Sequence, residues 1–109
     1  MAIDVAALAA QMSNAALPIL KSSAPSIGGY VQGECAKIAQ TIATIESERA
    51  ASGISDDEAK LLLEMQKGAM RSVLLSAEGL GLLAVEKAIN AALDAVKPIV
   101  NVALGFALL

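Results

Sequence analysis

Residues 51–58, ASGISDDE, decide the fold that the sequence predicts. Gly53 suits the left-handed backbone conformation that commonly follows the last turn of a helix, so we predict it at the C′ position. Ser55 and Glu58 stand three residues apart and form a capping box, in which each side chain accepts a hydrogen bond from the other residue's backbone N–H. One helix therefore ends and a second begins within this stretch, which predicts a tight turn between antiparallel helices.

The segment before this turn, residues 27–51, carries an apolar seam of the kind that packs against another helix. Val31, Ile38 and Ile45 follow one another at steps of seven residues, which is the repeat of a helix buried along one stripe. The segment after the turn, residues 56–78, contains no proline. We therefore predict that the two segments form a long helical hairpin.

Two further helices are predicted, one on either side of the hairpin. The first covers residues 3–21, with a kink or an early end at Pro18, because proline lacks the N–H that the preceding turn needs. Across residues 79–81 the polar stripe moves by about a quarter turn around an ideal helix, which indicates a break or a bend. We predict a bend or a break near 79–81, followed by a last helix over residues 82–107. Both arrangements remain open: one long helix that bends at 79–81, or two helices that meet there.

The composition agrees with an all-helical chain. Hydrophobic residues make up 56% of the 109 residues and aromatic residues only 2%, so the apolar content comes mostly from alanine and leucine, which favour helix. Charged residues make up 17%, below the roughly 25% of a typical globular domain. We therefore predict a single all-α domain over residues 1–109, built as an antiparallel bundle of three to four helices and short of polar surface.

The sequence predicts no nucleic-acid, metal, cofactor or catalytic site. The net charge is −3 and the eight lysines and arginines are scattered, whereas nucleic-acid binding needs a basic stripe. The chain contains no histidine, which removes the commonest general base and metal ligand. The single cysteine, Cys35, cannot form an internal disulfide, and we interpret it as a small core residue. The protein is therefore not expected to be an enzyme.

The surplus of apolar surface predicts self-assembly. A helix that is apolar over most of its circumference is normally buried in a larger body, and a monomer of three or four helices cannot bury such a face on every helix. We expect a structural or interaction protein that forms a homo-oligomer or binds another helical protein. Gly79 and Gly81 are expected to allow close helix approach. The predicted interface consists of Gly79, Leu80, Gly81, Leu82, Leu83, Ile89, Leu93, Val96, Val100, Leu104 and Phe106.

Two alternative functions fit the same apolar content. The first is a membrane-active protein, holin-like or pore-forming, whose C-terminal part enters lipid. Asp94 and Lys97 stand near the centre of that part, and each charge would cost about 2.5–3.5 kcal/mol in a membrane, so we favour the assembly that stays out of lipid. The second alternative is a chaperone-like or antitoxin-like binder that keeps an apolar groove for another protein.

The N-terminal segment is expected to be a helix of a cytoplasmic protein. Its apolar stretch has roughly the length of a signal-peptide core, but Asp4 stands where a signal peptide carries positive charge. We therefore interpret this segment as the first helix of the bundle.

Overall fold

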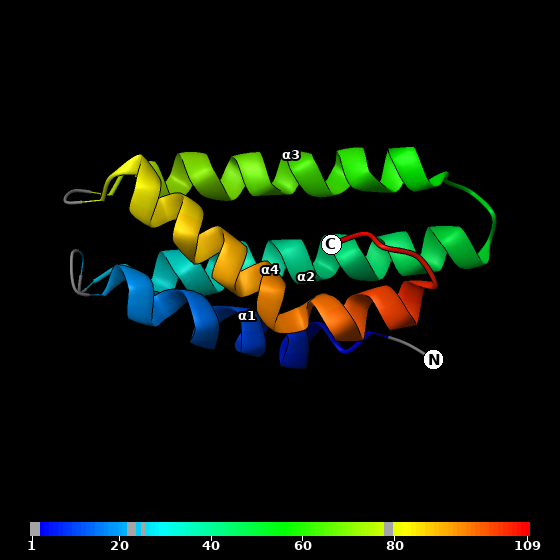
Figure 1. Ribbon diagram of the computed structural model, residues 1–109, viewed down its shortest axis with the longest axis horizontal. Helices are drawn as coiled ribbons and strands as arrows, with labels where there is room; N and C mark the ends of the chain where they lie inside the picture. The colour runs from blue at the N-terminus through cyan, green and yellow to red at the C-terminus, as the bar shows by residue number, and fades with distance from the viewer. Residues whose placement is uncertain (1–2, 22–23, 25, 78–79) are drawn as a thin grey trace.

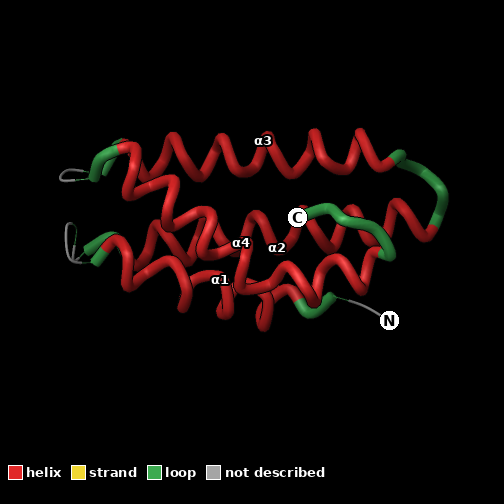
Figure 2. The backbone as a smooth tube through the Cα atoms, in the orientation of Figure 1, coloured by secondary structure: helices red, strands yellow, loops and turns green. Residues whose placement is uncertain are grey.

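The described part of the chain folds as four α-helices, which confirms the predicted all-α bundle (Figure 1). The computed structural model describes residues 3–21, 24, 26–77 and 80–109, and no strand occurs within these residues (Figure 2). The helices are α1 (Val5–Leu20), α2 (Gly28–Ala50), α3 (Asp56–Leu75) and α4 (Leu82–Leu104).

The helices form an elongated bundle of 43 × 22 × 18 Å. α1 packs against α2 and α4, and α3 also packs against α2 and α4, whereas the described residues of α1 and α3 do not contact each other. In Figure 1, α3 lies along one edge of the bundle and α1 lies toward the opposite edge. α3 therefore turns one face to the bundle and the opposite face outward.

The core forms where the apolar sides of the helices meet. The predicted seam of α2 lies within it: Val31, Ile38 and Ile45 are fully buried, which confirms the interpretation of the seven-residue repeat. α1 contributes Met12 and α4 contributes Ile89, and both are also fully buried. Side chains from helices far apart in the sequence thus share one core, as expected for a single domain.

The turn between α2 and α3 contains the predicted capping box. The Glu58 N–H donates to the Ser55 hydroxyl oxygen at 3.1 Å, and the Ser55 N–H donates to the Glu58 carboxylate at 2.9 Å. The hydrogen bond from the Ser55 backbone, aided by the Ser55 side chain, lowers the pKa of the Glu58 carboxyl, because it stabilises the charged form. α3 therefore begins at the residue that the sequence predicts.

The end of α2 differs from the prediction by one residue. The left-handed residue is Ser52, with a φ of 56°, and not Gly53. The Gly53 N–H donates to the Glu48 carbonyl at 2.7 Å. The Ser52 N–H donates to the Arg49 carbonyl at 3.0 Å. These are the two hydrogen bonds of a Schellman motif with Ser52 at C′. The prediction for Gly53 was wrong. It rested on the preference of glycine for the left-handed conformation, whereas the hydrogen bonds of the turn place Ser52 at that position.

Replacing Ser52 by glycine should stabilise the protein. A left-handed conformation costs a residue with a side chain about 1–2 kcal/mol, and glycine removes this strain. Glycine also has more conformational freedom in the unfolded chain, which offsets about 0.4–1 kcal/mol of the gain. We expect a net gain of about 0.5–1 kcal/mol, measured by thermal or urea denaturation. The control is Ser47→Gly inside α2, which should lower stability. A lower melting temperature for Ser52→Gly would contradict this account of the turn.

The structure also decides the predictions for residues 79–81 and for Pro18. α3 ends at Leu75 and α4 begins at Leu82, so of the two arrangements left open the structure has two helices and not one bent helix. Of the two alternatives predicted at Pro18, a kink or an early end, the early end does not occur, because α1 continues beyond this proline to Leu20. Leu20 is fully buried, and its packing compensates for the single backbone hydrogen bond that proline removes.

α4 ends earlier than predicted, at Leu104 and not at residue 107. Gly105 has a φ of 76°, and its N–H donates to the Asn101 carbonyl at 3.0 Å, which is the left-handed glycine ending of a helix. The chain then turns back, and the Leu109 N–H donates to the Asn101 side-chain oxygen at 3.0 Å. Leu108 is thereby buried against the core.

Candidate functional site: exposed apolar helix faces

Part of the predicted interface lies inside the chain's own core. These residues come from the face of α4 that packs against the other helices, so their apolar pattern is accounted for by folding of the single chain. In this fold their side chains are covered before any partner binds. The residues concerned are Ile89, Leu93, Val96 and Val100.

The other predicted interface residues of the described chain lie nearer the surface. Leu82 and Leu83 are exposed, with 72% of Leu83 accessible to solvent. Phe106 is partly buried, and the Arg49 guanidinium lies 4.1 Å from the centre of its ring, a cation–π contact within the chain. Leu80 and Leu104 also pack partly against the core. 

Of the two glycines predicted to allow close helix approach, only Gly81 belongs to the described residues. Gly79 lies outside the described residues. Gly81 is the exposed N-cap of α4, and nothing lies within 4 Å of the position that a Cβ would take. Within the chain, therefore, Gly81 does not mark a tight helix crossing.

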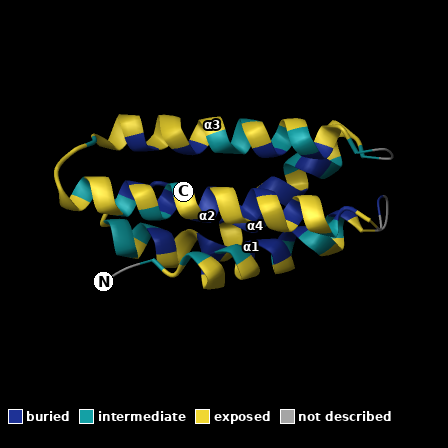
Figure 3. Ribbon diagram, turned by 180° about the vertical axis from the view of Figure 1, so that it is seen from behind, coloured by how far each residue is buried: buried dark blue, intermediate teal, exposed yellow. Residues whose placement is uncertain are grey.

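The outward face of α3 carries a second apolar stripe that the fold does not cover. Leu61 and Met65 are each 62% exposed, and Leu75 is also exposed. Figure 3 shows exposed positions along the outer side of α3 and buried ones toward the bundle. The buried side consists of Ala59, Leu63, Met70 and Leu74. α3 thus has two apolar faces, and only one of them packs within the chain.

We name this outward stripe the α3 seam and define it as Leu61, Met65, Gly68, Ser72 and Leu75. Its residues follow at steps of four, three, four and three, the spacing of the contact positions of paired helices. The middle of the seam is small: at Gly68 an added Cβ would meet only the Arg71 side chain, at 4.0 Å. The seam therefore has large ends and a shallow centre.

One flank of the α3 seam is charged. Asp57, Glu64 and Arg71 stand at steps of seven residues along it. The Lys67 ammonium donates to the Glu64 carboxylate at 3.1 Å, and the Arg71 guanidinium forms an ion pair with Glu86 of α4. Hydrogen bonding from Arg71 lowers the pKa of the Glu86 carboxyl. Along this flank the acidic residues Asp57 and Glu64 come first and the basic residue Arg71 follows.

The other flank of the α3 seam carries no charge after Glu58, which stands at its N-terminal end near Leu62. It consists of Leu62, Ala69 and Ser76, which are all exposed and stand at steps of seven residues. The seam therefore has a charged side and an uncharged side, and this asymmetry distinguishes the possible ways in which two helices could pair.

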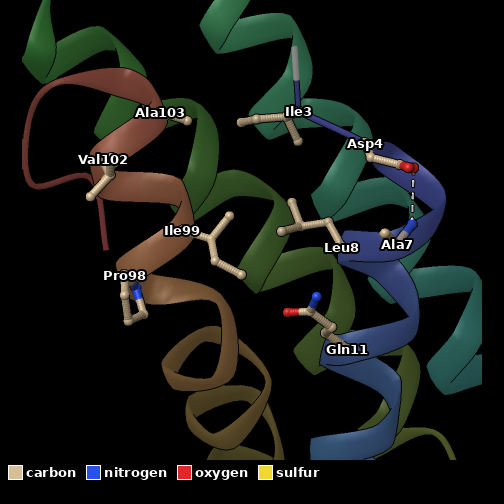
Figure 4. A pocket seen from close by; sticks show the side chains of 9 residues that line it. All are labelled: Ile3, Asp4, Ala7, Leu8, Gln11, Pro98, Ile99, Val102 and Ala103. Atoms are coloured by element: carbon tan, nitrogen blue, oxygen red, sulfur yellow. Dashed lines mark hydrogen bonds between the residues drawn. The ribbon is translucent and has the colours of Figure 1, made fainter. Parts of the chain in front are cut away.

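A second apolar surface lies between α1 and α4. It is a groove of about 520 Å³, and Figure 4 shows Leu8 and Ile99 on its opposite walls. Val102, at its edge, is 83% exposed. The Asp4 carboxylate also lines the groove, and it caps α1 by accepting from the Ala7 N–H at 3.1 Å. The lining residues are Ile3, Asp4, Ala7, Leu8, Gln11, Pro98, Ile99, Val102 and Ala103.

The described part of the chain offers little reactive chemistry. It contains no group of three or more histidine, cysteine, aspartate or glutamate residues that could hold a metal ion. Cys35 is buried, and desolvation raises the pKa of its thiol, which keeps it protonated and unreactive. None of the described helices is both long enough and apolar enough to span a membrane. The surfaces that remain as candidate sites are apolar.

Comparison with protein families, curated proteins and solved structures finds no match to this chain. The candidate sites therefore rest on the geometry of the molecule itself.

The interface predicted from the sequence begins at Gly79 and does not include the α3 seam. The signal was present in the spacing from Leu61 to Leu75, which repeats the four–three pattern on the side opposite Leu63 and Met70. Two apolar stripes on one helix are hard to separate from sequence alone, because only the packed structure shows which of them is covered.

Proposed function

We propose that this protein is a non-catalytic interaction protein that self-associates through exposed apolar helix faces. The observation that carries the proposal is the state of the surface after folding. A core of fully buried side chains is already in place, yet nine large apolar side chains of the described residues remain exposed. Three of them, Leu61, Met65 and Leu75, lie along one outward stripe of α3.

The physical argument concerns the free energy of exposed apolar area. Removing apolar surface from water yields about 25 cal/mol per Å², and exposed apolar patches with polar borders mark interaction sites on soluble proteins. A surface helix normally has one apolar stripe, facing the core. α3 has a second one, which supports a partner that covers it.

The experiment is a mass measurement without detergent. Size-exclusion chromatography with light scattering should give a defined multiple of the 11.0 kDa chain mass, with a multimer fraction that grows with concentration. A parallel run with lipid vesicles tests the membrane alternative. A chain that remains a monomer at every concentration, or that is recovered only with vesicles, would rule out the proposed function.

A further inference from the structure

We propose that the α3 seam pairs with the same seam of a second copy of this chain, in antiparallel orientation, around a two-fold axis near Gly68. The inference rests on the proposed function and names the contact through which self-association occurs. It follows from three properties of the seam: its residue spacing, its small centre, and the order of the charges along one flank.

The spacing makes the seam complementary to itself. In an antiparallel pair centred on Gly68, positions whose numbers add up to about 136 stand opposite each other. Leu61 then faces Leu75 of the second copy, and Met65 lies beside Ser72 of the second copy. Each large side chain of the seam therefore has a residue of the second copy to pack on. The two Gly68 residues meet at the centre, where the absence of side chains lets the helices approach closely. A contact of this kind closes after two copies.

The charges select a second copy as the occupant. A two-fold axis perpendicular to the helix pair keeps each flank on its own side, so the charged flank of one copy lies next to the charged flank of the other. Glu64 then lies beside Arg71 of the second copy, and the symmetry repeats this contact. Glu64 is well exposed, and Arg71 is partly exposed, so both can reach across. Such complementary pairs fix orientation and partner choice.

The same charges disfavour the parallel arrangement. In a parallel pair the two-fold axis runs along the helices and places the charged flank of each copy against the uncharged flank of the other. Glu64 and Arg71 would then face Leu62 and Ala69 of the second copy and gain no ion pair. The antiparallel arrangement is therefore the one that the flanks support.

The size of the contact sets the expected affinity. One helix seam with two flanks involves fewer residues than the 20–30 on each side of a standard stable interface. We therefore expect a reversible dimer with a Kd on the order of 10 µM, detectable as a rise in average mass over the micromolar range.

Charge reversal tests the reciprocal ion pairs. Glu64→Arg places two arginines together at both contacts. The double variant Arg71→Glu/Glu86→Arg keeps the pair within the chain, with its signs exchanged, and places two glutamates together between copies. Each should raise the Kd by about tenfold or more, because like charges are costly at an interface. The triple variant Glu64→Arg/Arg71→Glu/Glu86→Arg has opposite charges again at both contacts and should recover the wild-type Kd.

Sedimentation velocity gives the Kd values, and circular dichroism checks that each variant is folded. Wild-type affinity in the first two variants, or failure of the folded triple variant to recover association, would overturn the inference.

A second pair of variants tests the apolar part of the contact. Met65→Lys places a charge in the seam and should abolish dimer formation at micromolar concentration. Tyr30→Lys is the matched control, because Tyr30 is 61% exposed on α2 and belongs neither to the α3 seam nor to the groove between α1 and α4, and it should leave the Kd unchanged. A monomeric wild-type chain would refute the proposed function itself. A multimeric wild type that is insensitive to Met65→Lys would refute only the α3 contact and leave self-association in place.

Discussion

Replacing Ile89 by aspartate will leave most of the chain unfolded, although the sequence pattern suggested an interface role for this residue. Ile89 is fully buried on the inner face of α4. The substitution removes a large apolar side chain from the core and leaves a carboxylate without a partner in a site closed to water. We expect a loss of about 4–5 kcal/mol or more in the free energy of unfolding, comparable to the whole stability of a small domain, about 5–15 kcal/mol.

The matched control is Leu83→Asp, on the same helix at a side chain that is 72% exposed. Its stability should stay within about 0.5 kcal/mol of the wild type, as for most surface substitutions. Far-UV circular dichroism and urea denaturation of both variants give the answer. A folded Ile89→Asp variant with native stability would show that this face of α4 does not form the core.

The second large effect concerns the two faces of α3. Leu63 is 4% exposed and faces the bundle, whereas Leu61, two positions earlier, is 62% exposed and faces outward. Leu63→Ala should lower the free energy of unfolding by about 2–5 kcal/mol, because it removes buried methyl groups and leaves a cavity. Leu61→Ala should change the stability of the monomer by less than about 0.5 kcal/mol. The change from leucine to alanine thus lowers the free energy of unfolding on the core face of α3 but not on its outer face.

Association should respond in the reverse order. Leu61→Ala removes an end of the α3 seam and should raise the dimer Kd by about tenfold, the effect of losing about 1.4 kcal/mol at an interface. Urea denaturation at a concentration well below the Kd gives the monomer stability, and sedimentation gives the Kd. Equal loss of monomer stability in the two variants would contradict the assignment of α3 as a helix with two separate apolar faces.

Much of the fold follows from local signals in the sequence. The capping box of Ser55 and Glu58 fixes the start of α3, because its two hydrogen bonds involve residues only three apart. The seven-residue repeat from Val31 to Ile45 identifies the buried side of α2 correctly. The exact ends of α2 and α4 could not be predicted, since they depend on which residue adopts the left-handed conformation, as Ser52 does.

The interaction surface could not be read from the sequence in the same way. Periodicity shows that a side chain is apolar, but not whether the chain itself or a partner covers it. Ile89 and Val100 looked available for assembly, yet both lie in the core. Leu61 and Met65 belong to a second stripe whose exposure depends on the position of α3 at the edge of the bundle. That position follows from how all four helices pack together.

The most direct test of the central claim is the mass of an equimolar mixture of Glu64→Arg and Arg71→Glu/Glu86→Arg. Each variant alone should associate with itself at least about tenfold more weakly than the wild type, because it brings like charges together at both contacts. Together they place arginine opposite glutamate at each contact, so the mixture should sediment as a dimer that contains one copy of each variant. A mixture that sediments as monomers, under conditions in which the wild-type chain is dimeric, would contradict antiparallel pairing of α3 with a second copy.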